Sequence, residues 1–318
     1  DRLSLIGSWP GDGRPDDAVT LVDAVRERLG SSGTVIHDRA GSYSMQPDKE
    51  VEAAKDAEFI IVVLGENAEM SGEARSRATL GLPTQQLDLL AKVNALGKPY
   101  AVVVMAGRPL TLVPVAETAP AILFTWFGGT MAGPGIADVL FGDVNPSGKL
   151  PVTFPRSVGQ IPLTYDSTPT GRPFSPSNKW TSKYFDLQHG PLFPFGFGLS
   201  YTSFVISSPQ LKVPLIRQDE AVEFTVVVRN TGKVDGEEVV QAYIRDDVAS
   251  VARPTKELKA FRRVAVPAGQ SVTVDFKIPA KDLGFWKRDG TYLVEPGTFT
   301  LTVGNDSEAY QTGRFSVE

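Results

Sequence analysis

Apolar runs alternate with amphipathic stretches along the first half of the chain, which predicts alternating strands and helices. The expected strands are short and apolar, at residues 3–6, 34–36, 59–64, 101–105 and 121–126. The expected helices cover residues 19–29 after a cap at Asp16 or Asp17, 47–57, 84–96 after a cap at Thr84, and a segment around 136–140 that Gly142 closes. We therefore predict an α/β fold in which helices flank a mostly parallel sheet.

From about Phe204 onward the apolar period becomes two, as in Val222, Phe224, Val226 and Val228. The expected strands lie at residues 222–228, 239–244, 258–266, 272–278, 297–303 and 310–317, with turn residues between them. Short strands at this spacing predict an all-β, antiparallel sandwich of immunoglobulin or fibronectin type III shape.

Proline, glycine, serine and aromatic residues dominate the stretch between these halves, from about residue 143 to 203. Its aromatic content argues against a disordered linker, because disordered segments are poor in aromatics. We expect an ordered connector that packs across the first domain. The predicted domains are an α/β sandwich domain at residues 1–155, an ordered linker at 156–203 and a fibronectin type III-like domain at 204–318.

Composition narrows the function classes. The chain has 318 residues, a net charge of -5 and interspersed charges, which argues against nucleic acid and anionic membranes as partners. We expect no membrane-spanning segment, and we interpret the first six residues as a strand and not as a signal peptide. The sequence leaves the oligomeric state open, a homodimer included.

The residues that commonly hold metals or attack substrates are scarce. The absence of cysteine excludes disulfides, thiolate catalysis and cysteine-ligated metals. The two histidines, His37 and His189, offer no histidine-rich metal site, and no Gly-x-Ser-x-Gly motif supports a serine hydrolase. The glycines near residues 128–135 do not form a dinucleotide fingerprint. We expect neither a metal nor a cofactor.

One loop concentrates ionisable side chains. Residues 65–77 directly follow the expected strand at 59–64, and open α/β sheets bind ligands beyond the carboxyl ends of their strands. We expect Glu66 to hold the loop through hydrogen bonds to backbone N–H groups, and Glu69 to lie at the surface. Arg75 and Arg77 are candidates for orienting a glutamate or contacting substrate, with loop bracing as the competing interpretation.

Several strings in the chain match a known family. They are GRPL at residues 107–110 after Lys98-Pro99, ADVLFGDVNPSGKLPVTFP at 137–155 and PFGFGLSYTSF at 194–204. With them the chain resembles the C-terminal part of glycoside hydrolase family 3, in particular the bacterial periplasmic β-glucosidase branch. The resemblance covers essentially the whole chain and has the same order of domains.

The resemblance implies a retaining exo-β-glycosidase that acts on a β-glucoside or oligosaccharide in the periplasm or outside the cell. It places the acid/base on Glu73 and the nucleophilic Asp on an N-terminal barrel domain, in the same or another chain, whose motif is absent here. Arg75, Arg77 and Trp126 are then candidates for substrate binding. For Trp126, which follows an expected strand, core or interface packing is the competing interpretation.

Some positions depart from the family. Ala78-Thr79 stands where relatives usually carry Thr-Asp, and the stretches at residues 6–9 and 37–49 look short. Two other functions stay open at this point. One is a non-catalytic carbohydrate-binding or scaffolding module of the same fold; the other, disfavoured by the missing serine motif, is a different α/β hydrolase.

Overall fold

The chain folds into two compact units. The computed structural model describes residues 1–37 and 46–318. The first unit comprises Asp1–Val144 and Pro155–Ile161, and the second comprises Asn145–Phe154 and Pro162–Glu318. Residues 145–154, which we had placed in the first domain, are thus part of the second unit. The predicted division into domains at residues 1–155, 156–203 and 204–318 stays a prediction.

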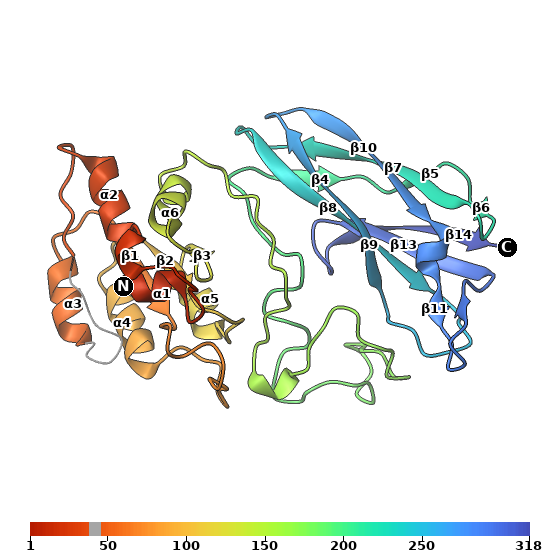
Figure 1. The fold of residues 1–318 in the computed structure, drawn as a ribbon, viewed down its shortest axis with the longest axis horizontal. Helices are drawn as coiled ribbons and strands as arrows, with labels where there is room; N and C mark the ends of the chain where they lie inside the picture. The colour runs from red at the N-terminus through yellow and green to blue at the C-terminus, as the bar shows by residue number, and fades with distance from the viewer. Residues whose placement is uncertain (38–45) are drawn as a thin grey trace. The chain divides into compact units, whose positions relative to one another are not determined.

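The first unit is an α/β layer structure (Figure 1). Three strands, β1 (Ile60–Gly65), β2 (Tyr100–Met105) and β3 (Ile122–Phe124), pair in parallel in the order β1-β2-β3. The helices are α1 (Arg2–Ile6), α2 (Leu21–Leu29), α3 (Pro47–Ala54), α4 (Thr84–Ala95), α5 (Val113–Thr118) and α6 (Ala132–Leu140), with 3-10 turns η1 (Pro15–Asp17) and η2 (Val158–Gln160). The α/β prediction with a parallel sheet is confirmed.

The central strand of the sheet is apolar on both faces, so both faces must be covered. Helices lie on each side of the sheet and provide this cover. Val102, Val103 and Val104 of β2 are completely buried. Val103 belongs to a cluster with residues of α2 and α6, such as Val25 and Ile136. Figure 1 shows α4 and α5 on the opposite side of the sheet from α2 and α6. Helices on both faces leave the carboxyl ends of the strands as the open edge.

The second unit is a β-sandwich. Its strands are β4 (Phe204–Ile206), β5 (Gln210–Leu211), β6 (Leu215–Ile216), β7 (Ala221–Asn230), β8 (Gly236–Asp246), β9 (Glu257–Val266), β10 (Ser271–Pro279), β11 (Phe285–Trp286), β12 (Tyr292–Leu293), β13 (Gly297–Gly304) and β14 (Tyr310–Val317), with one 3-10 turn, η3 (Ala280–Leu283). One sheet has the order β10-β7-β4 with β5 beside β7, and the other has the order β6-β14-β13-β8-β9. The all-β prediction is confirmed.

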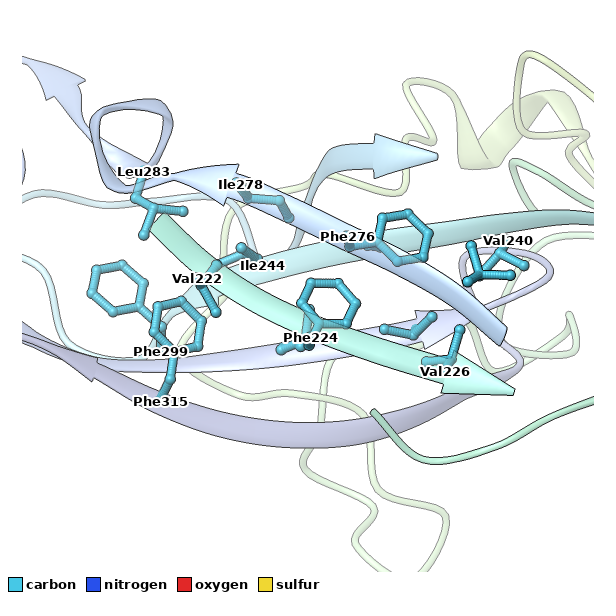
Figure 2. Close-up of a cluster of buried hydrophobic side chains, with 14 of the residues drawn as sticks. Val222, Phe224, Val226, Val240, Ile244, Phe276, Ile278, Leu283, Phe299 and Phe315 are labelled. Carbon is cyan, nitrogen blue, oxygen red and sulfur yellow. The ribbon is translucent and has the colours of Figure 1, made fainter. Parts of the chain in front are cut away.

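Alternating apolar residues of the two sheets form the core of the sandwich (Figure 2). The rings of Phe224 and Phe276 stack with centroids 5.0 Å apart, and those of Phe299 and Phe315 stack at 5.4 Å. Aromatic pairs of this kind contribute about 0.5–1.5 kcal/mol beyond their buried area.

Residues 145–203 contain no α-helix or β-strand. Their only regular structure is the 3-10 turn η2 and an isolated bridge between Phe154 and Phe193. Within the second unit, Lys149 pairs with the buried Glu238 of β8 at 2.7 Å and donates to the carbonyl of Gly198. The side chain of Asn145 donates to the carbonyl of Asp235 and accepts from the backbone N–H of Tyr201. These contacts hold the irregular stretch against the sandwich.

Two predicted strands are wrong. Residues 2–6 form the short helix α1, because the Asp1 carboxylate accepts the backbone N–H of Ser4 at 2.9 Å and caps it. Residues 34–36 form no strand, and Val35 instead packs against the apolar cluster of α2 and α6. A run of so few apolar residues does not distinguish a strand from other buried segments.

Two helix caps also differ from the prediction. Thr20, not Asp16 or Asp17, begins α2 through a capping box with Asp23, while the two aspartates lie in η1. Pro83 occupies the cap of α4, and Thr84 is its first residue. The shortened stretch at residues 37–49 falls largely outside the described residues. No helix in the described part is both long and apolar enough to span a bilayer.

Candidate functional site

The candidate site lies at the carboxyl edge of the parallel sheet. Because β1, β2 and β3 run in the same direction, the segments that follow them meet at one edge. These segments are the loop at residues 66–77, the Gly107-Arg108 pair and the Trp126-Phe127 pair. We call residues 66–77 the arch.

The start of the arch is fixed by Gly65. Its φ of +134° is a conformation that L residues rarely adopt, and a Cβ there would lie 1.8 Å from the carbonyl oxygen of Met105. The buried amide of Gln86, from α4, accepts the Gly65 N–H at 2.8 Å and donates to its carbonyl at 2.9 Å. The N–H and the carbonyl of Gly65 are thereby both hydrogen-bonded to one side chain. This fixes the direction in which the arch leaves the sheet.

Glu66 is the buried anchor of the arch. Its side chain is 0% exposed, and its two carboxylate oxygens accept from Arg77 Nη1 at 2.5 Å and from Arg108 Nε at 3.2 Å. The predicted bonds to backbone N–H groups are therefore wrong: two guanidinium groups take their place. A carboxylate removed from water needs such partners, because an unpaired buried charge is very costly.

Arg108 connects both arms of the arch. Besides the Glu66 carboxylate, it binds the carbonyl oxygens of Met70 at 2.6 Å and Arg75 at 2.9 Å, both through Nη2. These two carbonyls lie on either side of Glu73 in the sequence. Arg108 belongs to the GRPL string but was not among the predicted site residues, although its place shortly after the end of β2 was a usable signal.

Ser8 holds the arch from the other side. Its hydroxyl contacts the carbonyl oxygens of Ala68 and Ser71. Gly72, with a φ of +144°, approaches Ser8 so closely that a Cβ would lie 2.7 Å from the Ser8 Cβ. The arch is therefore held at its base by Glu66 and near its top by Ser8 and Arg108.

Glu73 lies in the tight turn at the top of the arch. The turn is closed by a bond from the Arg75 N–H to the Gly72 carbonyl at 3.2 Å, and Ala74 adopts a positive φ of 57°. Glu73 is exposed, and its carboxylate makes no hydrogen bond or ion pair with any residue that the structure describes. Strained turns that hold a side chain without partners are common at functional sites.

The two predicted arginines differ in their surroundings. Arg77 is partly buried and is engaged by Glu66 and by the carbonyl of Gly81 at 2.9 Å. Arg75 is exposed, and its guanidinium has no hydrogen-bond partner among residues 1–37 and 46–318. Only Arg75 thus has its donors directed to solvent.

Aromatic residues border the arch. Trp126, directly after β3, has a positive φ of 57° and meets Phe124 edge-on with centroids 4.8 Å apart. Positive φ is a genuine outlier for so bulky a residue. Trp9, which the sequence analysis did not single out, is 71% exposed and places its indole nitrogen beside Gly72. Both tryptophans are suited to packing against the apolar face of a ligand.

The site offers the exposed carboxylate of Glu73 and the exposed guanidinium of Arg75 on the arch, with Trp9 beside Gly72 and Trp126 directly after β3. In the described part of the chain, no group of three or more His, Asp or Glu residues is placed to hold a metal ion. Such an arrangement is suited to proton transfer with a ligand that brings polar atoms and an apolar face.

Comparison with known proteins identifies relatives along the whole chain. The model of the glycosyl hydrolase family 3 C-terminal domain matches residues 2–201, and that of a fibronectin type III-like domain matches residues 238–307. A periplasmic beta-glucosidase of Salmonella typhimurium is 41% identical over 99% of the chain, and a beta-xylosidase of Formosa agariphila is 41% identical over 96%.

Solved structures agree with these matches. A beta-glucosidase from Listeria innocua, in complex with glucose, superposes with a TM-score of 0.89 at 35% identity, over 99% of this chain and 44% of that one. The chain covers 45% of the Salmonella relative and 42% of the Formosa relative. It therefore spans less than half the length of these relatives.

Proposed function

The chain belongs to glycosyl hydrolase family 3, whose C-terminal domain it contains, and from this membership we propose that it is the C-terminal portion of a retaining exo-β-glycosidase. Its substrates are terminal, non-reducing β-D-glucosyl residues of glucosides or oligosaccharides. The relatives named beta-glucosidase and periplasmic support this sugar and a periplasmic or extracellular location. A xylosyl residue is the alternative that the Formosa relative suggests.

In this proposal Glu73 is the general acid/base. Retaining hydrolysis uses two carboxyl groups about 5–5.5 Å apart, one as nucleophile and one as proton donor and acceptor. Glu73 donates its proton to the leaving oxygen while a nucleophilic Asp of a barrel domain attacks the anomeric carbon. In the second step the Glu73 carboxylate takes a proton from water, whose oxygen attacks the anomeric carbon and breaks the bond between the Asp and the sugar. This releases the sugar and restores both carboxyl groups.

The observation that carries the proposal is the contrast between Glu66 and Glu73. Glu66 is buried and held by two arginines, whereas Glu73 is exposed and makes no described bond, although its turn is fixed. A carboxylate that must gain and lose a proton in each cycle works best without a permanent cationic partner. Its environment is completed when the barrel domain closes over the arch.

The neighbouring residues take supporting roles. We propose that Arg75 and Trp126 contact the substrate, Arg75 through hydrogen bonds to hydroxyl groups and Trp126 through its ring. For Arg77, the bonds to Glu66 and Gly81 favour bracing over substrate contact. The scheme needs no cofactor or metal, because one carboxyl group transfers the proton and the other forms the covalent bond to the sugar.

A fusion protein tests the proposal. The N-terminal part of the Salmonella relative, joined ahead of this chain, should hydrolyse para-nitrophenyl β-glucoside, whereas the chain alone should not. Glu73→Gln in the fusion should lower kcat by about 10²–10⁴-fold, the range of general acid–base catalysis. Glu69→Gln, an exposed glutamate of the same arch, is the matched control and should leave kcat unchanged.

The alternative is a non-catalytic carbohydrate-binding or scaffolding module. Calorimetry with cellobiose distinguishes the two: such a module binds the sugar without any added domain, whereas half of an active site does not. Hydrolysis by the chain alone that survives Glu73→Gln would contradict both the role of Glu73 and the need for a barrel domain.

A further inference from the structure

Residues 170–189 form an ordered excursion without helix or strand, which we call the aromatic loop. Its two arms are joined by bonds from the Ser182 N–H to the Arg172 carbonyl at 3.1 Å and from the Ser182 hydroxyl to Thr170. At its tip, the Trp180 N–H donates to the Asn178 side chain at 2.9 Å. These bonds connect segments of the loop to one another.

The large side chains of this loop are exposed. Phe185 is 99% exposed, Trp180 70%, Tyr184 46% and Phe174 39%. The ring of Phe174 stacks on His189 with centroids 3.8 Å apart. An ordered loop that presents several aromatics to water on one short segment is unusual, because contiguous exposed apolar surface usually marks an interaction site.

The composition of the loop is that of a protein–protein contact. Tryptophan, tyrosine and arginine are the residue types that most often dominate binding energy at protein interfaces. The aromatic loop combines its aromatics with the exposed Arg172, Lys179 and Lys183. The Lys179 ammonium lies over the Trp180 ring at 4.8 Å, which keeps a cation at the edge of the apolar surface. A single sugar ring would cover one of these aromatics; a folded protein surface would cover all of them.

We propose that the aromatic loop is a docking surface for the barrel domain, which rests on the function proposed above. The length of the relatives is the reason for choosing the barrel domain as the docking partner. The chain matches them over nearly its full length but covers less than half of theirs, so a large folded part accompanies this region in those proteins. The loop would give that part a docking contact separate from the arch.

The absence of cysteine from the chain allows a direct test. A single Phe185→Cys variant should react rapidly with a maleimide in the isolated chain, because the position is fully exposed. In the fusion with a cysteine-free N-terminal part of the Salmonella relative, the reaction should be slowed by about tenfold or more, since a covered thiol reacts only when the contact opens. Val248→Cys, 83% exposed in the β-sandwich, is the control and should react equally in both proteins.

Each outcome decides the proposal. Equal reactivity of Phe185→Cys in the isolated chain and in the fusion would overturn it. Protection in the isolated chain that increases with its concentration would also overturn it, in favour of a second copy as the occupant. The labelling needs no turnover, so it is separate from the catalytic proposal: a fusion that hydrolyses through Glu73 without protecting position 185 would reject only the docking surface.

Discussion

Arg108 donates from Nε to the buried carboxylate of Glu66 at 3.2 Å, and this ion pair joins the end of β2 to the arch after β1. The same guanidinium holds the backbone on both sides of Glu73. The position of the exposed carboxylate thus depends on a residue that does not touch it. This relationship makes Arg108 a positioning residue and leads to the first prediction.

Replacing Arg108 should reduce activity more than it reduces sugar binding. In the fusion, Arg108→Lys keeps the charge but cannot bind Glu66 and two carbonyls at once, because lysine lacks the planar fork of donors. We expect kcat to fall by about tenfold or more with little change in KM, since misplacement of a catalytic group affects mainly the transition state. An equal loss in Arg75→Lys with unchanged KM would contradict the separate roles of the two arginines.

Removing the charge of Glu66 should destabilise the first unit. Glu66→Gln leaves the guanidinium groups of Arg77 and Arg108 without their buried counter-ion, and breaking a buried pair in this way costs about 3–5 kcal/mol. Urea denaturation of the chain measures the loss. Glu69→Gln, on the exposed part of the arch, should change the free energy of unfolding by less than about 0.5 kcal/mol. Similar values for the two variants would show that Glu66 is not an anchor.

A methyl group at position 65 should be poorly tolerated. Gly65→Ala places a Cβ against the backbone of Met105 in a conformation that alanine rarely adopts. We expect a loss of at least about 3 kcal/mol, from the strain of the backbone and the displacement of β2. Gly81→Ala is the matched control, because its Cβ would meet only the Thr111 hydroxyl, at 3.7 Å. Thermal unfolding of both variants tests the prediction.

Acid should weaken the start of α2. The Thr20 hydroxyl donates to the Asp23 carboxylate at 2.8 Å, and this bond, aided by nearby Arg2 and Arg26, lowers the pKa of Asp23 below its usual value of 3.8. The folded chain therefore favours the charged form, so this contribution to stability is present above the usual pKa and is lost as the pH falls through the lowered pKa. Thermal melts from pH 7 to strongly acid pH should show a steeper loss for the wild type than for Asp23→Asn. Parallel curves would contradict the assignment.

The sequence predicted the parallel sheet and the sandwich because burial of apolar side chains determines both. The sequence shows β2, which is buried apart from its last residue, as a continuous apolar run, and it shows the alternating β7 as a period of two. The helix α1 was missed because its five residues fit either structure, and the capping bond from Asp1 decides between them. Local capping geometry has a weaker signal than hydrophobic periodicity.

The candidate site was predictable only in part. The arch was identified from its position after a buried strand, but its internal contacts were not. Arg108 lies 42 residues from Glu66, and only the pairing of β1 with β2 brings them together. Trp9 reaches the arch through the contact of Ser8 with Gly72, which no sequence pattern indicates. The role of Glu73 came from the family resemblance and remains a proposal.

The most direct test of that role is the rescue of a Glu73→Ala fusion by azide. Without its acid/base, a retaining enzyme should still be glycosylated by dinitrophenyl β-glucoside, whose leaving group needs no proton, but should hydrolyse the covalent intermediate slowly. Azide needs no general base, so it should accelerate turnover and yield β-glucosyl azide. Formation of this product by Glu73→Ala, and not by Glu69→Ala, is the expected result. Unchanged hydrolysis of substrates with poor leaving groups, with no azide product, would contradict the assignment of Glu73.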